Sequence, residues 1–190
     1  GKTNVLRILV EQARTQGQVF LFDSKNLELY GFKQKERVVY IENDAGLTES
    51  IELINSVCIQ HKAAFEEYVK TKTDITPKQY YEQLDSNYIM VDDMDDLAAK
   101  YQMRIKELVS LFTLAAESGF GIVVTHNSSK PKSFDELCKW FRTSTNGLVV
   151  GSQGAAGIYP VVPVKDTPRT GEGLLYINNT YERLQIPLYQ

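Results

Sequence analysis

Apolar residues recur along much of the chain at intervals of three and four, the spacing that places them on one face of a helix. Residues 4–16 show this pattern first, and Gly17 follows them in a position to end the helix. A second helical pattern covers residues 48–72 and is interrupted over residues 74–77. Thr76-Pro77, at the end of this break, is typical of a helix start. These signals predict helices over residues 4–16, 48–72, 76–84, 104–117 and 134–141.

Short runs rich in β-branched and aromatic residues lie between these segments, and several of them end in acidic or polar side chains. They predict strands over residues 18–23, 37–42, 88–92, 121–125 and 147–150, and a hairpin over 174–186 that turns at Asn178-Asn179. Strands that alternate with helices predict a three-layer α/β/α fold around a mostly parallel sheet. We expect the hairpin to add an antiparallel edge to that sheet.

The chain opens with Gly1-Lys2-Thr3, directly before the first predicted helix. A phosphate-binding loop ends in this way, because glycine lets the backbone approach the phosphates, lysine reaches the β- and γ-oxygens and the threonine hydroxyl helps to hold Mg²⁺. The tripeptide also arises by chance, so by itself it is weak evidence. With Asn4, these residues are the candidates for binding ATP phosphates.

An apolar strand that ends in paired acids is the second candidate element. Residues 89–93 read Ile-Met-Val-Asp-Asp, the form of a Walker B strand. Asp92 would support the Mg²⁺ shell together with Thr3, and Asp93 stands where a catalytic glutamate normally polarises the attacking water. Aspartate is one methylene shorter, which predicts weak catalysis. The alternative, at about even odds, is that the acids at 92, 93, 95 and 96 cap the helix that follows.

The strand predicted over residues 121–125 has a polar exit. Thr125, His126 and Asn127 are candidates for sensing the γ-phosphate beside the Walker B strand. The alternative is that Asn127 starts a turn, and for His126 alone a structural role is favoured. The order of these elements is typical of an additional-strand, RecA-like P-loop ATPase.

Composition narrows the possible partners. The 190 residues include 21 basic and 24 acidic side chains, a formal net charge of −3, and no basic stripe is visible in the sequence. Proteins that bind nucleic acid through phosphate contacts usually carry a basic excess, so we expect no nucleic acid partner.

Cys58 and Cys138 lack metal-site spacing and are expected to be free, buried thiols. No apolar run reaches the roughly 20 residues of a membrane helix.

Nearly the whole chain resembles the FtsK/SpoIIIE family of P-loop ATPases. Four segments carry the resemblance: residues 20–25, similar to the family's strand and D-x-K segment; 88–97, similar to its Walker B strand and acidic helix start; 107–125, similar to its helix and next strand; and 171–176, similar to its closing G-x-G hairpin.

Within this family the chain is most similar to the tandem ATPase domains of the type VII secretion proteins called EssC, YukB or EccC. Its departures from the active pattern point to their third, C-terminal domain. Asp93 replaces the expected glutamate, and residues 114–118 and 144–153 carry no arginine to serve a neighbouring subunit. Arg142 and Arg169 are possible substitutes, although we favour reading both as ordinary solvent-exposed arginines.

The resemblance implies a degenerate ATP-binding motor domain, with Mg²⁺ and with weak or no independent hydrolysis. It also implies a cytoplasmic domain of a membrane-anchored protein, neighbouring ATPase domains in the same polypeptide, and assembly as a homo-oligomer such as a hexamer. The implied substrates are small, helical WXG-type secreted proteins, which residues 101–108 or 157–160 could contact. Both segments also suit packing, which we favour two to one.

Two other functions stay open. One is a DNA-translocating FtsK-like motor, which a DNA-stimulated ATPase assay would reveal. The other is an interaction module that kept the fold and lost nucleotide, for which Mg·ATP would produce no thermal shift. In all cases we expect residues 1–190 to form a single domain whose first strand and early phosphate loop lie upstream of Gly1, because a P-loop sheet is built around that strand.

Overall fold

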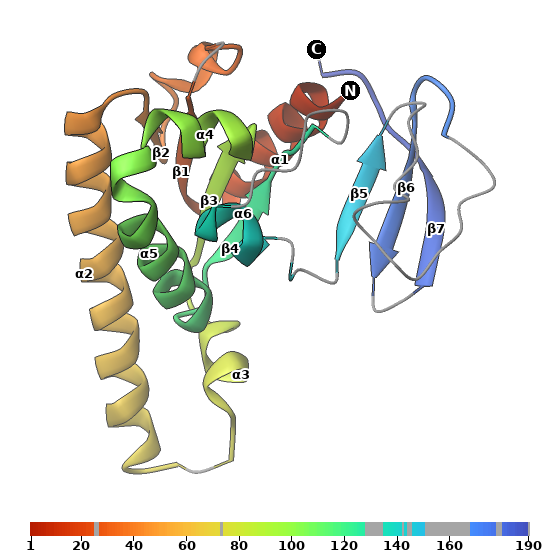
Figure 1. Ribbon diagram of the computed structural model, residues 1–190. Coiled ribbons are helices and arrows are strands. Elements are labelled where there is room, and N and C mark those ends of the chain that lie inside the picture. The colour runs from red at the N-terminus through yellow and green to blue at the C-terminus, as the bar shows by residue number, and fades with distance from the viewer. Residues whose placement is uncertain are drawn as a thin grey trace.

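The computed structural model describes residues 1–24, 27–72, 74–127, 135–141, 143, 146–150, 168–177 and 180–189. They form a four-stranded parallel sheet between helices and a three-stranded antiparallel sheet beside it (Figure 1). The elements in chain order are α1 (Lys2–Gln16), β1 (Gly17–Asp23), η1 (Tyr30–Phe32), β2 (Val38–Ile41), α2 (Asp44–Val69), α3 (Pro77–Tyr81), β3 (Ser86–Asp92), α4 (Met94–Lys100), η2 (Gln102–Arg104), α5 (Ile105–Glu117), β4 (Gly121–Val124), α6 (Glu136–Phe141), β5 (Gly147–Val150), β6 (Glu172–Ile177) and β7 (Thr180–Gln185).

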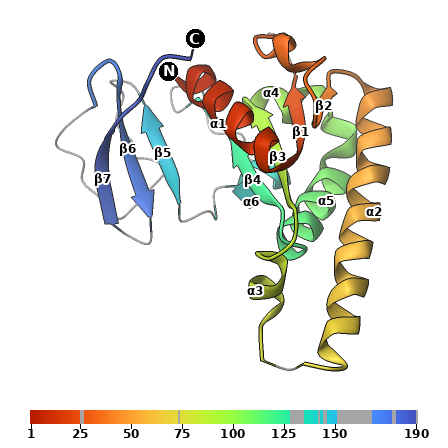
Figure 2. The same ribbon diagram turned by 180° about the vertical axis from the view of Figure 1, so that it is seen from behind.

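The parallel sheet has the strand order β2-β1-β3-β4 and a helical layer on each face. Alternate residues of β1 divide the core between the two faces, as the period of two in a strand requires. Val19 and Leu21 pack with the buried side of α1, whereas Phe20 and Phe22 pack with the helices of the opposite face, among them α2 and α5. Figure 2 shows α1 covering the sheet from the side opposite to α2 and α5. The predicted α/β/α layers are therefore confirmed.

The junction between α1 and β1 contains no turn. Gly17 has an extended backbone with φ −175°, and it is the first residue of β1 as well as the residue that follows the helix. A Cβ at this position would lie 1.4 Å from the carbonyl oxygen of Ser86, so only glycine fits between the two strands. The residue expected only to stop the helix is thus also part of the sheet.

The start of α2 lies four residues before the predicted one. Asn43 caps it, with its side chain accepting a hydrogen bond from the Gly46 amide at 2.9 Å. An asparagine cap supplies one of the acceptors that the first turn of a helix lacks, which explains the earlier start. At its other end, α2 extends with α3 beyond the amino edge of the parallel sheet (Figure 1).

An aromatic cluster joins this extension to the sheet. His61 of α2 stacks on Tyr81 of α3 at 6.0 Å, and its Nδ1 lies 2.9 Å from the Ser118 carbonyl oxygen. Gly119 follows with φ +88°, and a Cβ there would lie 2.5 Å from the Cβ of Tyr81. The turn between α5 and β4 therefore needs glycine for both its conformation and its close contact with α3.

The hairpin differs from its prediction. β6 pairs with β7 as expected, but its other neighbour is β5, and the three strands form a sheet of their own. Among the described residues, β4 pairs only with β3 and β5 only with β6, so the antiparallel strands are not an edge added to the parallel sheet. The turn at residues 178–179 lies outside the described residues. The expectation of an additional strand upstream of Gly1 stays a prediction.

Candidate functional site

The amino end of α1 lies at the carboxyl edge of the parallel sheet. The helix has 15 residues, about 22 Å, and turns directly into β1, which spans about the same length in the opposite direction. Lys2 is therefore carried back to the edge where β1 ends at Asp23. Figure 2 shows the N-terminus at the edge of the sheet toward which the arrowheads of β1 and β3 point. Gly1 also adjoins the end of β5, since its added Cβ would lie 3.3 Å from Val150.

Of the predicted phosphate-binding residues, Lys2 and Thr3 are available for a ligand. Within the described residues, neither the Lys2 ammonium nor the Thr3 hydroxyl has a protein partner, and both side chains are half-buried. The first turn of α1 has Gly1 as its N-cap, no side-chain capping bond and no acidic residue. Its amides and the positive end of its dipole therefore favour a bound anion, with Lys2 adding a full positive charge.

Asp92 is buried at the carboxyl end of β3. The Thr125 hydroxyl donates a hydrogen bond to Asp92 Oδ1 at 3.0 Å. Burial is the largest influence on the pKa of Asp92 and raises it, the Thr125 bond opposes that effect, and the Asp23, Glu28 and Asp93 carboxylates raise the pKa further. A buried carboxylate with few donors around it suits a divalent cation, which would favour its charged form.

Thr125 joins the end of β4 to the turn between β3 and α4. Its hydroxyl accepts a hydrogen bond from the Asp93 amide at 2.7 Å while donating to Asp92, and its carbonyl accepts one from the Met94 amide at 2.9 Å. The residue proposed as a phosphate sensor thus holds the Walker B turn. The sequence did not predict this contact, although a threonine at a strand end beside paired acids is the signal for it.

Asp93 takes up a strained backbone conformation with φ 57° and is the N-cap of α4. Its Oδ1 accepts hydrogen bonds from the amides of Asp95 and Asp96 at 3.2 and 3.4 Å. The capping role that the sequence left open is therefore present. A role for Asp93 in orienting water stays a prediction.

His126 and Asn127 follow Thr125 and are half-buried. His126 Nδ1 lies 2.9 Å from Asp95 Oδ2, an ion-pair distance without the alignment of a hydrogen bond. The Cys138 thiol of α6 contacts the other oxygen of Asp95 at 3.8 Å. His126 therefore ties the end of β4 to α4, in line with the structural role favoured for it, and the sensor role of Asn127 stays a prediction.

Asp23 is a residue of this edge that the sequence reasoning did not select. It pairs with Asp92 in the register of β1 and β3 and is 1% exposed. Its Oδ2 accepts hydrogen bonds from the Leu29 amide at 2.9 Å and the Tyr40 hydroxyl at 2.7 Å, and its Oδ1 has no partner among the described residues. The signal in the sequence was an acid at the end of a buried strand.

Asn4 makes contacts that the phosphate-loop motif did not predict. Its side chain bonds to Pro187 and Tyr189, after β7, rather than standing free at the edge of the sheet. Its backbone belongs to the first turn of α1, next to Lys2 and Thr3.

The donors at this edge fit magnesium bound with a nucleotide. The described residues include no group of three or more His, Cys, Asp or Glu side chains that could hold a metal ion by themselves. Mg²⁺ in nucleotide sites needs only one or two protein oxygens, because phosphates and water complete its shell. Thr3 and Asp92 could supply those oxygens.

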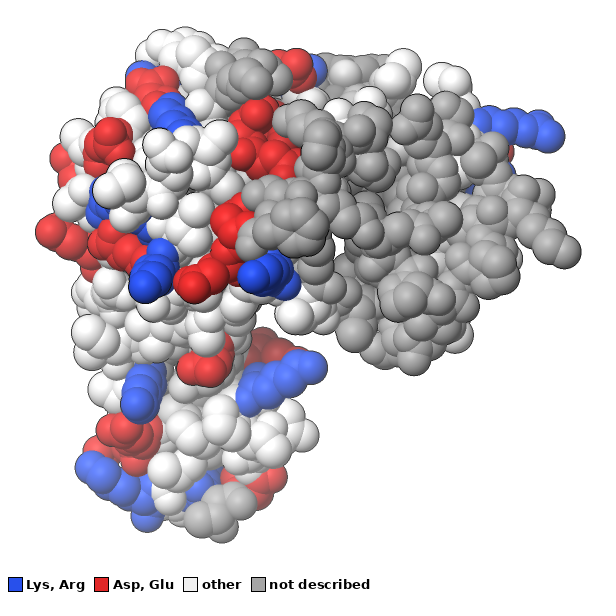
Figure 3. Space-filling view, in the orientation of Figure 1, with Lys and Arg blue, Asp and Glu red and all other residues white. Residues whose placement is uncertain are grey.

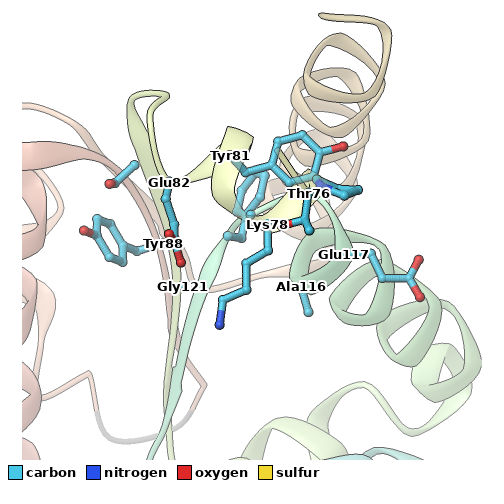
Figure 4. A pocket seen from close by; sticks show the side chains of 12 residues that line it. Thr76, Lys78, Tyr81, Glu82, Tyr88, Ala116, Glu117 and Gly121 are labelled. Atoms are coloured by element: carbon cyan, nitrogen blue, oxygen red, sulfur yellow. The ribbon is translucent and has the colours of Figure 1, made fainter. Parts of the chain in front are cut away.

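A cavity of about 680 Å³ lies at the opposite, amino edge of the sheet, between α3, the end of α5 and the first residues of β3 and β4. Tyr81 and Tyr88 form part of its wall, and its charged lining residues are Lys78, Glu82 and Glu117 (Figure 4). It shares no residue with the predicted nucleotide site.

The other surfaces considered from the sequence are partly packed, partly exposed and partly outside the described residues. Tyr101 and Leu108 are buried, so the packing alternative holds for both, while Met103 between them is 93% exposed. The segment 157–160 and Arg142 lie outside the described residues. Arg169 is exposed, and its amide donates to Glu172.

Charges on the described surface are mixed. On the face shown in Figure 3, lysine and arginine side chains alternate with aspartate and glutamate, and the described residues there form no continuous basic stripe. Both cysteines are free and buried, as expected. No helix in the described part of the chain is long and apolar enough to cross a membrane.

Comparison with known proteins shows which solved structures share this fold. No family model and no curated protein matches the chain. Its structure, in contrast, matches solved structures over almost its whole length, and the mixed α/β architecture is that of P-loop ATPase domains. A structure described as an ATPase covers 92% of this chain with a TM-score of 0.57 and 17% identity, over 64% of its own length.

More specifically, the fold is that of the ATPase domains of EssC. The cytoplasmic domain of EssC matches 99% of this chain with a TM-score of 0.83 and 18% identity. ATPases 2 and 3 of EssC from Geobacillus thermodenitrificans match 99% with a TM-score of 0.75 and 17% identity. The chain spans only about a third of either structure, 37% and 35%. The predicted EssC-like ATPase fold is confirmed.

Proposed function

We propose that this chain is a nucleotide-binding motor domain of the type VII secretion kind. The observation that carries the proposal is that the uncapped α1 amino end and the buried Asp92 carboxylate lie at the same edge of the sheet. A positively polarised helix end at the same edge as an acid that has no basic partner among the described residues suits the Mg²⁺ complex of a nucleoside triphosphate. The EssC-like fold supports the same function.

The residues at this edge divide the binding between them. Gly1, Lys2, Thr3 and the backbone amide of Asn4 surround the phosphates, with Lys2 supplying the positive charge and the first-turn amides supplying hydrogen bonds. Bound Mg²⁺ neutralises phosphate charge, and Thr3 and Asp92 are its protein ligands. Thr125 holds Asp92 in place through its hydroxyl, and Asn127 faces the γ-phosphate.

Hydrolysis in the isolated domain is weak or absent in this proposal. Asp93 occupies the position of the catalytic base, but its carboxylate caps α4 through the amides of Asp95 and Asp96. An acceptor used in this way is held back from water, and aspartate is also shorter than glutamate. The domain then binds ATP as a coupling module.

The proposed partners follow from the resemblance to type VII secretion ATPases. The domain works beside other ATPase domains of one polypeptide, in a homo-oligomer such as a hexamer, on the cytoplasmic side of a membrane-anchored protein. It contributes to recognising or exporting small helical WXG-type proteins. Titrating the domain with a fluorescently labelled WXG-type protein, with and without Mg·ATP, tests this part, and an absence of binding in both conditions would contradict it.

The nucleotide site is tested by calorimetry with Mg·ATP. Lys2→Ala removes the positive charge that meets the phosphates, and we expect it to abolish measurable binding. Lys35→Ala is the matched control, because Lys35 is an exposed lysine whose side chain has no partner among the described residues. Unchanged affinity in Lys2→Ala would refute the P-loop assignment.

A further inference from the structure

The segment after β7 lies along α1. Asn4 Nδ2 donates a hydrogen bond to the Pro187 carbonyl at 2.8 Å, and Asn4 Oδ1 accepts one from the Tyr189 amide at 2.8 Å. One side-chain amide therefore satisfies a carbonyl and an amide of the same extended segment, residues 186–189. Ile186 anchors the segment at its start, since its amide donates to the Gly171 carbonyl at 2.7 Å.

Tyr189 fixes the far end of the segment. Its ring is half-buried and lies 6.0 Å from that of Phe32, within the core layer that α1 covers. Its hydroxyl donates to Glu11 Oε1 at 3.2 Å, two turns further along α1. Leu188 points away and is 83% exposed. The segment thus holds α1 at two places, its first turn and its middle.

Among the described residues, the first turn of α1 has no other side-chain support of this kind. Gly1 offers no capping group, and Lys2 and Thr3 have no protein partners within the described residues. Helix ends with unsatisfied amides fray, and the order of that first turn must be established before it can bind an anion. The Asn4 contacts lie one residue from Thr3, so they order the turn that the phosphates would meet.

We propose that Asn4 is a positioning residue, and that docking of residues 186–189 on α1 sets the nucleotide affinity of the domain. This inference rests on the proposed nucleotide site. Docking and nucleotide binding both favour the ordered first turn, so each strengthens the other, and the coupling is reciprocal. Any factor that draws the segment away from α1 weakens nucleotide binding without touching a residue that contacts the nucleotide.

Two variants separate positioning from direct contact with the ligand. Asn4→Ala removes both hydrogen bonds from α1, and Tyr189→Ala removes the ring anchor while leaving Asn4 in place. The matched controls are Gln12→Ala, an exposed α1 amide with no side-chain partner in the described part of the chain, and Leu188→Ala, the exposed neighbour of Tyr189. Circular dichroism establishes that each variant is folded.

We expect both test variants to lower Mg·ATP affinity about fivefold or more by calorimetry, the lower end of typical coupling between sites, and both controls to leave it unchanged. The double variant should lose little more than either single one, because both act through one docked state. Hydrogen exchange supplies a second readout: Mg·ATP should slow exchange of the Tyr189 amide in the wild type but not in Asn4→Ala.

The outcomes distinguish this inference from the function on which it rests. If the wild type binds no Mg·ATP, the proposed nucleotide site fails. If it binds, and Tyr189→Ala binds equally well with no nucleotide effect on exchange, the coupling is overturned and the nucleotide site stands. Loss of affinity in Asn4→Ala alone would make Asn4 a direct ligand contact and would also overturn the coupling.

Discussion

Asp23 and Asp92 lie opposite each other in the register of β1 and β3, both buried at the carboxyl edge of the sheet. Asp23 has two donors on one oxygen, from Leu29 and Tyr40, whereas the described partner of Asp92 is the Thr125 hydroxyl. The neighbouring Asp23 carboxylate disfavours the charged form of Asp92, and it thereby adds to the effect of burial in raising the pKa of Asp92. Without a bound cation, the charged form of Asp92 is therefore unfavourable for the stability of the domain.

Replacing Asp92 should therefore change how stability depends on pH. The folded pKa of Asp92 is raised above its ordinary value of 3.8, so the folded state binds the proton more tightly than the unfolded state does. Protonation of Asp92 therefore stabilises the fold at low pH, and this stabilisation is lost as pH rises through the folded pKa. We expect Asp92→Asn to have a higher free energy of unfolding than wild type at pH 7. The difference should vanish below about pH 3.8.

Urea denaturation at a series of pH values measures this difference. Asp74→Asn is a suitable control, since Asp74 is exposed far from the sheet edge. The same Asp92→Asn protein should bind ATP with little dependence on Mg²⁺. A variant less stable than wild type at pH 7 would contradict the assignment of burial as the dominant cause.

Thr125 should act through Asp92. Thr125→Val removes the hydroxyl and leaves the Asp93 amide without its acceptor, so we expect a loss of about 1–3 kcal/mol in the free energy of unfolding. Mg²⁺-dependent ATP affinity should fall about tenfold, because the magnesium carboxylate is no longer held. Thr125→Ser keeps the hydroxyl and should retain both the stability and the affinity of the wild type. A serine variant with reduced affinity would contradict the positioning role.

Asp93 should behave as a cap and not as a catalytic base. Asp93→Glu places a poor capping residue at a positive φ, and we expect it to lower the free energy of unfolding by about 1–2 kcal/mol without raising ATP hydrolysis. Asp93→Asn can adopt the same backbone and accept the same bonds, so it should be nearly as stable as wild type. A glutamate variant that gains hydrolysis would show that the site lacks only the longer side chain.

Gly119 should tolerate no side chain. Its φ of +88° and the 2.5 Å approach of an added Cβ to Tyr81 predict that Gly119→Ala costs about 2–4 kcal/mol. Gly31→Ala is the control, because nothing lies within 4 Å of its added Cβ, and its effect should stay within about 0.5 kcal/mol. Equal thermal stability of the two variants would contradict the close packing of α3 on this turn.

The parallel sheet was predictable because its signals are local. Buried strands such as β1 and β3 read as apolar runs that end in acids, and α1 shows helical spacing throughout. Thr76 caps α3 with Gln79 in a capping box, a pattern visible in four consecutive residues. The amino-terminal position of Lys2 on α1 follows from the same local pattern.

The relations that the sequence did not predict join residues far apart in the chain. The amide of Asn4 meets residues more than 180 positions later, and no spacing rule connects them. The pairing of β5 with β6 depends on which strands become neighbours in the folded chain. Strand propensity alone does not determine this choice. Asp93 was ambiguous for another reason, since an acid after a buried strand suits a cap and a catalytic position equally.

The loop-free junction at Gly17 has a mechanical consequence. With glycine wedged against the Ser86 carbonyl, α1 and β1 share one rigid joint, so the helix cannot slide along its axis without dragging the strand beside Asp92. A displacement of Lys2 along the helix axis would therefore reach the amino edge of the sheet, where Ser86 and Tyr88 border the cavity next to α3.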